Sequence, residues 1–388
     1  MNKRKIGLLP RIVIAIVAGL LLGLVLPAPV VRMFVTFNGV FASFLFFCIP
    51  LIIVGLVAPA IADLDKSAGR LLLITTLIAY GSTLFSGFFT YFSCRAVFPF
   101  IIEPGAMLAS VDNPESSLLT SLFVIEMKPV FDVMTALTLA FILGIGVAVC
   151  KGETLKSALT DLKHIVERVI SVVIVPLLPF YIFGIFLNMS FSGTAFAIIA
   201  VFGKIIGVIF VLHVLLLLIQ YFTAGAITGR NPFKLLFNML PAYMTALGTS
   251  SSAATIPVSL AQVKKTGIRE DIADFCVPLC ATIHLSGSTM KIVAMALAIC
   301  MLTGIPYDLG YYSGFIMMLG IIMVAAPGVP GGAIMAAIGI LQSMLGFDEV
   351  AIGLITALYI AIDSFGTACN ITGDGAIAVV LDKIADKK

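Results

Sequence analysis

The chain has 388 residues, of which 61% are hydrophobic and 11% carry a charge, and its mean hydropathy is +1.17. A single soluble core of this length has no room for so many apolar side chains, so these values exclude an ordinary globular protein and indicate a polytopic membrane protein. The net charge is +3, and the basic residues are dispersed along the chain. Because they form no patch, nucleic acid is not expected as a partner, whereas the lipid bilayer is.

Eight apolar runs are each long enough for the roughly 20 residues that a bilayer requires. Arg4 and Lys5 precede the first run as in a secretory signal, but the run lacks a small-x-small cleavage site and further apolar runs follow. We therefore interpret it as the first membrane helix. The predicted spans are residues 12–28, 38–62, 71–99, 130–150, 166–190, 195–223, 272–303 and 350–381.

Two further apolar stretches, residues 232–264 and 308–346, are interrupted in the middle by small, polar or helix-breaking residues. If each of the eight runs spans once, lysine and arginine collect on one side of the membrane, which the positive-inside rule assigns to the cytoplasm together with both termini. This holds only if each broken stretch enters and leaves on one side, the first from the cytoplasm and the second from outside. Two opposed re-entrant hairpins result, and such paired interruptions indicate the substrate site of a transporter.

The tip of the first hairpin is rich in hydroxyl groups and reads TSSSAATIP from Thr249 to Pro257. Serine caps helix N-termini, and Pro257 suits the first turn of a new helix. Such a half-helix points its positive end and its free N–H groups at an anion, for example a carboxylate. The alternative is a polar turn outside the membrane, which the surrounding apolar residues disfavour.

The tip of the second hairpin reads AAPGVPGG from Ala325 to Gly332. Two prolines and three glycines within six residues cannot be helical. Exposed backbone groups in such a break can coordinate a cation or close over a ligand, and the glycines can serve as hinges of a gate. A plain loop between two helices is the competing interpretation.

Polar and charged residues also interrupt two of the predicted spans. The run 272–303 contains TIHLSGST at positions 282–289 and then Lys291. Hydroxyls and glycine can unwind a helix in the membrane and present oxygens to an ion or substrate, although serine and threonine also serve as packing contacts between helices. His284 alone would be a satisfied interior histidine, whereas a buried Lys291 ammonium must be paired or neutralised. The last run carries Asp363 and Asp374, each costing about 2.5 to 3.5 kcal/mol at bilayer depth.

The seven cysteines lie mostly in apolar stretches, where a free thiol behaves as a small hydrophobic group. Cys276 and Cys280 stand one helical turn apart, but no second cysteine pair accompanies them, so neither a disulfide framework nor a zinc site is predicted. No cofactor is expected.

Four motifs, taken together and in this order, resemble the dicarboxylate/amino acid:cation symporter family, which has the glutamate transporter fold. They are SSS at 250–252, the break at 282–288, GVPG at 328–331 and NITGD at 370–374. The resemblance covers nearly the whole chain. It implies an all-α polytopic membrane protein with eight transmembrane helices and two opposed re-entrant helical hairpins.

The family also implies an assembly and a movement. Residues 1–230 are expected to be mainly scaffold and trimerisation helices of a homotrimer, with the third and sixth helices partly contacting the transport core. Residues 231–388 are expected to form that core from the two hairpins and the last two spans, and to move like an elevator. The cell membrane (plasma or inner) is the expected location.

The resemblance assigns roles to individual residues by position. Asp363 matches the acid that holds the α-amino group of the substrate, and the serines of the first hairpin match its carboxylate-binding tip. The implied substrate-binding residues are Ser250, Ser251, Ser252, Ser288, Gly328, Val329, Pro330, Gly331, Asp363, Gly366, Thr367 and Asn370. Sodium is the expected coupling ion, and its implied ligands are Asn370, Asp374, Ser82, Thr83 and Ser286.

Departures from the family pattern narrow the substrate. Acidic-substrate members carry an arginine where this chain has Gly366, and without a guanidinium a second carboxylate would be desolvated unpaired. Together with Asp363, this favours a small neutral amino acid, and the pattern is closest to the serine/threonine branch of the family. His284 and Ser286 replace an asparagine and an aspartate of the family, which removes ion ligands, so His284 or Lys291 is expected as a proton site or a cation substitute.

The predicted function is secondary active symport of a small neutral amino acid, coupled to a sodium or proton gradient. A symporter of C4-dicarboxylates or acidic amino acids is the alternative within the fold, and an anion-conducting channel is the alternative from another class. An intramembrane protease would need a nucleophile and a base, which Ser250–Ser252 and His284 can supply. The paired hairpins suit binding better than catalysis, so the chain is not expected to be an enzyme.

Overall fold

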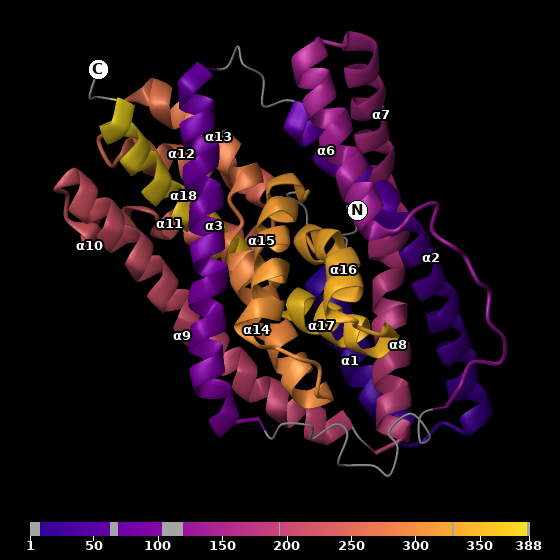
Figure 1. Cartoon of the computed structure of the whole chain (residues 1–388). Helices are drawn as coiled ribbons and strands as arrows, with labels where there is room; N and C mark the ends of the chain where they lie inside the picture. The colour runs from indigo at the N-terminus through magenta and orange to yellow at the C-terminus, as the bar shows by residue number, and fades with distance from the viewer. Residues whose placement is uncertain (1–7, 63–68, 103–118, 194, 328–329, 386–388) are drawn as a thin grey trace, which may run out of the picture.

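The computed structural model describes residues 8–62, 69–102, 119–193, 195–327 and 330–385. Within these ranges all regular structure is helical. The helices lie side by side in one bundle, with α9 crossing obliquely behind α3, α14 to α17 in the middle, and α10, α11 and α18 on the other side of α3 (Figure 1). The all-helical polytopic architecture predicted from the sequence is therefore confirmed.

Each of the eight predicted spans corresponds to a helix or to a pair of helices. Within the described ranges, five are long and apolar enough to cross a membrane, and a bent pair makes a sixth. Two shorter apolar helices, α1 and α6, account for the remaining spans. In chain order the spans are α1 (Leu8–Gly23), α2 (Ala28–Ala62), α3 (Gly69–Val97, continued by the short η2, Phe98–Phe100), α6 (Val133–Cys150), α7 (Glu153–Val169) joined through the π-turn η3 (Ile170–Ile174) to α8 (Val175–Phe191), α9 (Ala195–Thr228), α13 (Glu270–Ile283) with α14 (Ser286–Thr303), and α17 (Glu349–Ala361) with α18 (Asp363–Ala385).

Both interrupted stretches fold as helical hairpins, as predicted. The first contains α11 (Leu240–Thr249) and α12 (Ser252–Lys264), preceded by the short α10 (Pro232–Asn238), and the second contains α15 (Leu309–Ala325) and α16 (Gly332–Leu345). The prediction that Pro257 lies in the first turn of its helix is wrong. Because Ser251 is the N-cap, α12 begins at Ser252 and Pro257 follows in its second turn.

The last predicted span is not one continuous helix. Its two halves, α17 and α18, are bent by 63°, and Ile362 between them has φ −118° and ψ 23°. No proline lies in this segment, so the sequence carries no breaker signal at the bend. As a consequence Asp363 is the first residue of α18, at the break, rather than a residue inside a helix.

The helices pack as two groups. The first group is α1, α2, α6, α7 and α8, and the second is built around α13, α14 and α18, with α3 and α9 packed on it. Small residues allow close approach in the first group: a Cβ added to Gly23 of α1 would lie 2.6 Å from the Leu187 carbonyl oxygen of α8, as is common between membrane helices.

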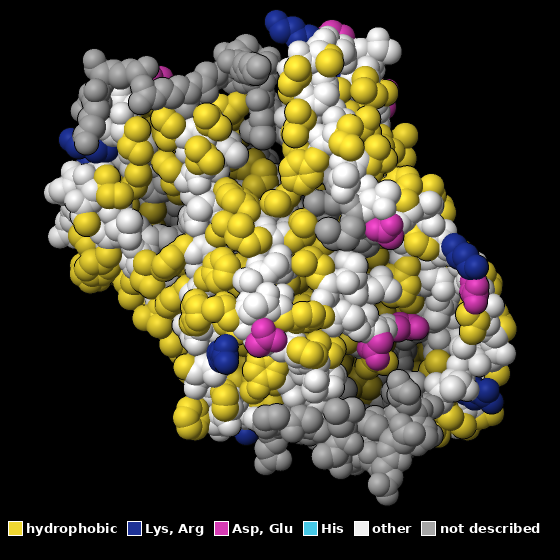
Figure 2. Space-filling model, in the orientation of Figure 1, with side chains coloured by type: hydrophobic (Ala, Val, Ile, Leu, Met, Phe, Trp, Pro, Cys, Tyr) yellow, Lys and Arg dark blue, Asp and Glu magenta, His cyan; other side chains and the backbone are white. Residues whose placement is uncertain are grey.

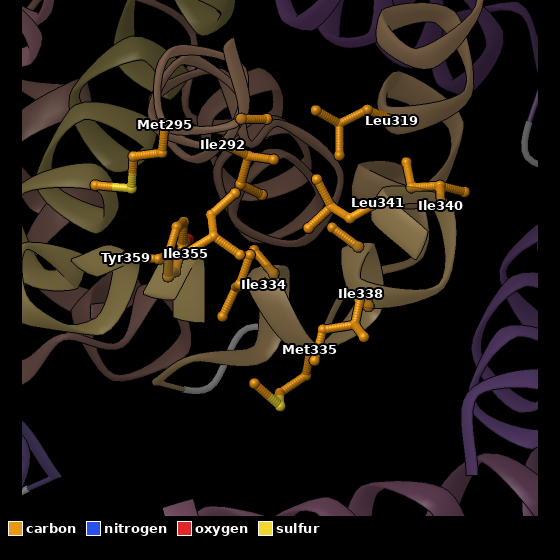
Figure 3. Packing of buried hydrophobic residues seen from close by; sticks show 14 of the residues in the cluster. Ile292, Met295, Leu319, Ile334, Met335, Ile338, Ile340, Leu341, Ile355 and Tyr359 are labelled. Carbon is orange, nitrogen blue, oxygen red and sulfur yellow. The ribbon is translucent and has the colours of Figure 1, made fainter. Parts of the chain in front are cut away.

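The interior and the outer face differ in the way a bilayer requires. Every residue of α14 from Ser286 to Leu302 is buried, and its Ile292 and Met295 lie near Ile334 of α16 and Ile355 of α17 (Figure 3). Hydrophobic side chains cover much of the face seen in Figure 2, where charged groups are few and scattered. Such an apolar surface suits contact with lipid.

Candidate functional site

The tip of the first hairpin exposes the N-terminus of α12. Ser250 ends α11 in the left-handed conformation, with φ +50°, and the Ser251 Oγ accepts a hydrogen bond of 3.3 Å from the Ala254 N–H. This side chain satisfies one of the free N–H groups of the helix end. The polar, N-capped half-helix predicted for this tip is therefore present, and Ser252 is its first residue.

The tip of the second hairpin is shaped by glycine. Gly331 has φ +75°, which only glycine adopts without strain, and a Cβ added to Gly332 would lie 2.3 Å from the Pro327 carbonyl oxygen. The Gly331 N–H donates a hydrogen bond of 2.8 Å to Asp363 Oδ2, so this tip is fastened to the start of α18. Pro330 precedes this contact, and Gly328 and Val329 lie outside the described residues.

The two hairpin tips meet at one pocket. It has a volume of about 600 Å³ and is lined by Ala253 of the first hairpin, Pro327 of the second and Thr282 at the end of α13. The opposite side is formed by α7, with Glu167 and Arg168 among its residues. The pocket thus lies between the two packing groups.

The break between α13 and α14 falls where the sequence predicted it. His284 is extended, with φ −111° and ψ 96°, and α14 begins at Ser286. The first N–H groups of α14 are held by α18, since the Asn370 Oδ1 accepts hydrogen bonds from Gly287 (2.8 Å) and Ser288 (3.2 Å). Asn370, an expected ligand of both substrate and sodium, therefore caps a helix in this structure.

Two other expected substrate contacts are also hydrogen-bonded within the protein. The Ser288 Oγ accepts hydrogen bonds from the Tyr359 hydroxyl (2.9 Å) and from Asn370 Nδ2 (3.0 Å). The Thr367 hydroxyl donates to the Asp363 carbonyl oxygen at 3.2 Å. The roles of these residues in substrate binding stay predictions.

Lys291 forms a buried ion pair with Asp363. Its Nζ lies 3.3 Å from Asp363 Oδ1, and the two side chains are 1% and 9% exposed. The same ammonium donates to the carbonyl oxygens of Ile362 (3.3 Å) and Asp363 (3.4 Å), and it lies 3.7 Å from the centre of the Tyr359 ring. Lys291 therefore neutralises the acid and also binds two carbonyl oxygens at the bend between α17 and α18.

Gly366 lies directly against this lysine. A Cβ added to Gly366 would be 2.3 Å from Lys291 Cε and 2.5 Å from Lys291 Nζ. The arginine of acidic-substrate members is missing here, but a side chain of α14 places an ammonium over the glycine of α18. The sequence could not show this, since the two residues come from different helices.

A second buried acid–base pair joins the same two segments. His284 Nδ1 lies 2.8 Å from Asp374 Oδ1, and both side chains are 0% exposed. His284 Nε2 is 3.0 Å from the Ser82 Oγ, and the Gln220 Nε2 donates to Ser82 Oγ (3.3 Å) and to Ser286 Oγ (3.1 Å). His284 is thus a hydrogen-bonded interior residue.

The expected sodium ligands do not form a single cage. Asp374, Ser82 and Ser286 gather around His284 and Gln220, whereas the Thr83 hydroxyl donates to the Ala79 carbonyl oxygen of its own helix at 2.9 Å. Asp374 Oδ2 and Gln220 Oε1 are buried and have no hydrogen-bond partner among the described residues. Buried acceptors of this kind call for a ligand or water.

The sequence reasoning missed three residues of this region. The Tyr359 ring supports the Lys291 ammonium, Gln220 joins two hydroxyls, and the Ser86 hydroxyl donates to the Ser286 carbonyl oxygen at 2.7 Å. A usable signal existed for Gln220, a polar residue inside a predicted span. Tyr359 gives no such signal, because tyrosine is common in apolar helices.

A membrane-embedded helix bundle with two opposed hairpins meeting at a pocket defines a class of secondary transporters. The family model described as "Sodium:dicarboxylate symporter family" matches residues 8–384, and the chain belongs to this family. It is accordingly a transporter and not an enzyme. Among similar proteins are two named serine/threonine transporter SstT, from Streptococcus thermophilus strains CNRZ 1066 and ATCC BAA-491 / LMD-9. Each is 27% identical over an alignment that covers 98% of this chain and 97% of the relative.

Proposed function

We propose that this transporter is a secondary active symporter of a small neutral amino acid. The observation that carries the proposal is Asp363, a buried carboxylate that contacts the gate-like tip of the second hairpin through Gly331 and binds an ammonium through its other oxygen. A carboxylate so placed suits the α-amino group of a substrate. The name of the two similar serine/threonine transporters agrees with a small polar side chain.

The N-terminus of α12 is the proposed partner of the substrate carboxylate. Its free N–H groups and the hydroxyls of Ser251 and Ser252 supply donors, and the helix end carries a partial positive charge. Ala253, next to these serines, lines the pocket shared with the second hairpin. A small amino acid can then be held between the two tips, ammonium on one side and carboxylate on the other.

An elevator movement is the proposed mechanism. The group formed by α3, α9, both hairpins and α13 to α18 would move against α1, α2, α6, α7 and α8, and the pocket beside α7 lies between these groups. Compared with the division expected at residue 230, this assignment moves α3 and α9 to the transport core. We further propose that the fixed group forms the centre of a homotrimer in the plasma or inner membrane, with both termini in the cytoplasm.

The family implies sodium as the coupling ion. His284 already occupies Oδ1 of Asp374. We therefore propose that at most one coupling sodium binds near Asp374, or that a proton carried by His284 replaces that sodium. The remaining unpartnered oxygens, Asp374 Oδ2 and Gln220 Oε1, suit a hard cation.

A symporter of C4-dicarboxylates or acidic amino acids is a second candidate, and one observation favours it. Lys291 places an ammonium at Gly366, where acidic-substrate members of the family carry an arginine. That ammonium is paired with Asp363, so the pair carries no net charge. A neutral pair favours a substrate without net charge, because every additional buried charge needs a partner.

Uptake by purified protein in liposomes tests this function. Labelled serine is supplied outside under an inward sodium gradient, an inward proton gradient or no gradient, with empty liposomes as the control. We expect serine to accumulate above its outside concentration with a gradient and only to equilibrate without one. Equilibration under every gradient would indicate a channel, and aspartate displacing serine at a lower concentration would indicate the acidic-substrate function.

A further inference from the structure

We propose that Lys291 is a substrate contact and that the Lys291–Asp363 ion pair opens to admit a zwitterion. Asp363 takes the ammonium of the substrate, and the released Lys291 ammonium takes its carboxylate. This inference rests on the proposed function, namely that the substrate is an amino acid. It adds a specificity-determining residue on α14.

In the structure the ion pair is closed on itself. An ammonium has three N–H donors, and those of Lys291 are met by Asp363 Oδ1 and by the carbonyl oxygens of Ile362 and Asp363. Asp363 Oδ2 is bound by the Gly331 N–H. Because the single negative charge of Asp363 compensates only one buried ammonium, a substrate ammonium that uses Asp363 must displace Lys291.

Burial decides which substrates can open the pair. The two side chains are 1% and 9% exposed, and a buried charge that loses its partner is strongly destabilising. A primary amine without a carboxylate would leave Lys291 unpaired, and a carboxylate without an amine would leave Asp363 unpaired. A zwitterion replaces both partners at once, so each charge remains compensated.

The surroundings of Lys291 permit such a movement. Its flexible stem lies against Gly366, which has no side chain to trap it. The Tyr359 ring, 3.7 Å from the ammonium, offers a face on which a cation is stabilised during the exchange. Because a carboxylate has two oxygens, it can bind Lys291 through one and the N-terminus of α12 through the other.

A purely structural role for Lys291 makes a different prediction. The ammonium binds the carbonyl oxygens at the bend between α17 and α18, so it can act as a staple that holds the bend. If Lys291 only holds the bend, its replacement lowers the stability of the protein and the uptake of all substrates alike. Removing one charge of a recognition pair changes which net charge the site prefers.

Competition against serine uptake separates these two roles. The competitors are ethanolamine, which is serine without its carboxylate, and 3-hydroxypropanoate, which is serine without its ammonium. For the native protein we expect each to compete about 100-fold less well than unlabelled serine, in the range for truncating a buried charge pair. In Lys291→Met, ethanolamine should compete better relative to unlabelled serine than it does in the native protein. In Asp363→Asn, 3-hydroxypropanoate should do so. Lys291→Arg keeps the positive charge, so the three competitors should rank as they do in the native protein.

The double variant Lys291→Met/Asp363→Asn guards against misfolding of the single variants. It leaves neither charge of the pair buried alone, so it should fold, and it should bind serine no better than either analogue. If Lys291→Met keeps the native preference for serine, the inference is overturned while the proposed function stands. If the double variant keeps it, the role proposed for Asp363 is overturned as well. If the native protein takes up no amino acid at all, the proposed function fails, and this inference fails with it.

Discussion

The two acids of α18 are each paired with a base from the segment around the α13–α14 break, and the two pairs differ in what surrounds them. Asp363 is bound to Lys291 beside the tip of the second hairpin, and its side chain is 9% exposed. Asp374 is bound to His284 where both side chains are 0% exposed, among hydroxyls of α3 and α14. The first pair borders the tip of the second hairpin, which we propose as a gate, and the second is enclosed by helices of one packing group.

This difference suggests separate duties for two similar contacts. If the second hairpin is a gate, as proposed, its opening would expose the Lys291–Asp363 pair and let it exchange partners with a substrate. A fully enclosed pair that bridges two helices of one group holds them together and neutralises a charge that the bilayer would not tolerate. We therefore expect changes at Lys291 to alter substrate preference and changes at His284 to alter stability and ion dependence.

Removal of the enclosed base is expected to have the largest effect. In His284→Ala the Asp374 carboxylate would lose its partner at 0% exposure, which costs about 3 to 5 kcal/mol. The variant should unfold at a markedly lower temperature in detergent. His284→Ala/Asp374→Asn should recover most of that loss, and substrate preference should not change. An unaltered unfolding temperature in the single variant would show that the pair is not a structural contact.

Gly366→Arg probes the other pair and is expected to be the next largest effect. Any side chain at Gly366 meets Lys291 within 2.5 Å, and an arginine would add a second buried cation. Serine uptake should fall by about 100-fold. Gly366→Arg/Lys291→Ala restores a single cation beside Asp363 and should regain serine uptake, with serine still preferred to aspartate because the pair is again neutral. Full serine uptake by the single variant would contradict the placement of Lys291 over Gly366.

A smaller effect is expected at the gate. Gly331→Ala forces a side chain to adopt φ +75° at a cost of about 1 to 2 kcal/mol. Since Gly331 fastens the second hairpin to Asp363, the KM for serine should rise about tenfold. Gly346→Ala is the matched control, because Gly346 has φ +68° and no atom within 4 Å of an added Cβ. An equal rise in KM for both would assign the effect to backbone strain alone.

The smallest expected effect comes from Tyr359→Phe. This change removes the hydroxyl that donates to Ser288 but keeps the ring beside Lys291, so stability should fall by about 1 kcal/mol and serine uptake should change little. Tyr312→Phe is the control, because it removes a buried hydroxyl that donates to Val293 away from the site. Loss of uptake in Tyr359→Phe alone would show that the hydroxyl, rather than the ring, serves transport.

The sequence predicted the parts of the site but not their partners. Three breaks lie where local sequence signals predicted them. The signals are the serines at the tip of the first hairpin, the prolines and glycines at the tip of the second, and the hydroxyls around His284 between α13 and α14. The bend at Ile362 has no such signal, and the carbonyl oxygens there are bound by Lys291 of another helix. The ammonium beside Gly366 was not predicted either, because it comes from Lys291, a residue distant in the chain.

A structure of the protein with a bound neutral amino acid tests the central claim most directly. We predict that the substrate nitrogen lies within hydrogen-bond distance of Asp363 and that Lys291 Nζ has moved from that carboxylate to a carboxylate oxygen of the substrate. An intact Lys291–Asp363 contact, with the amino acid bound elsewhere between the hairpins, would contradict the claim.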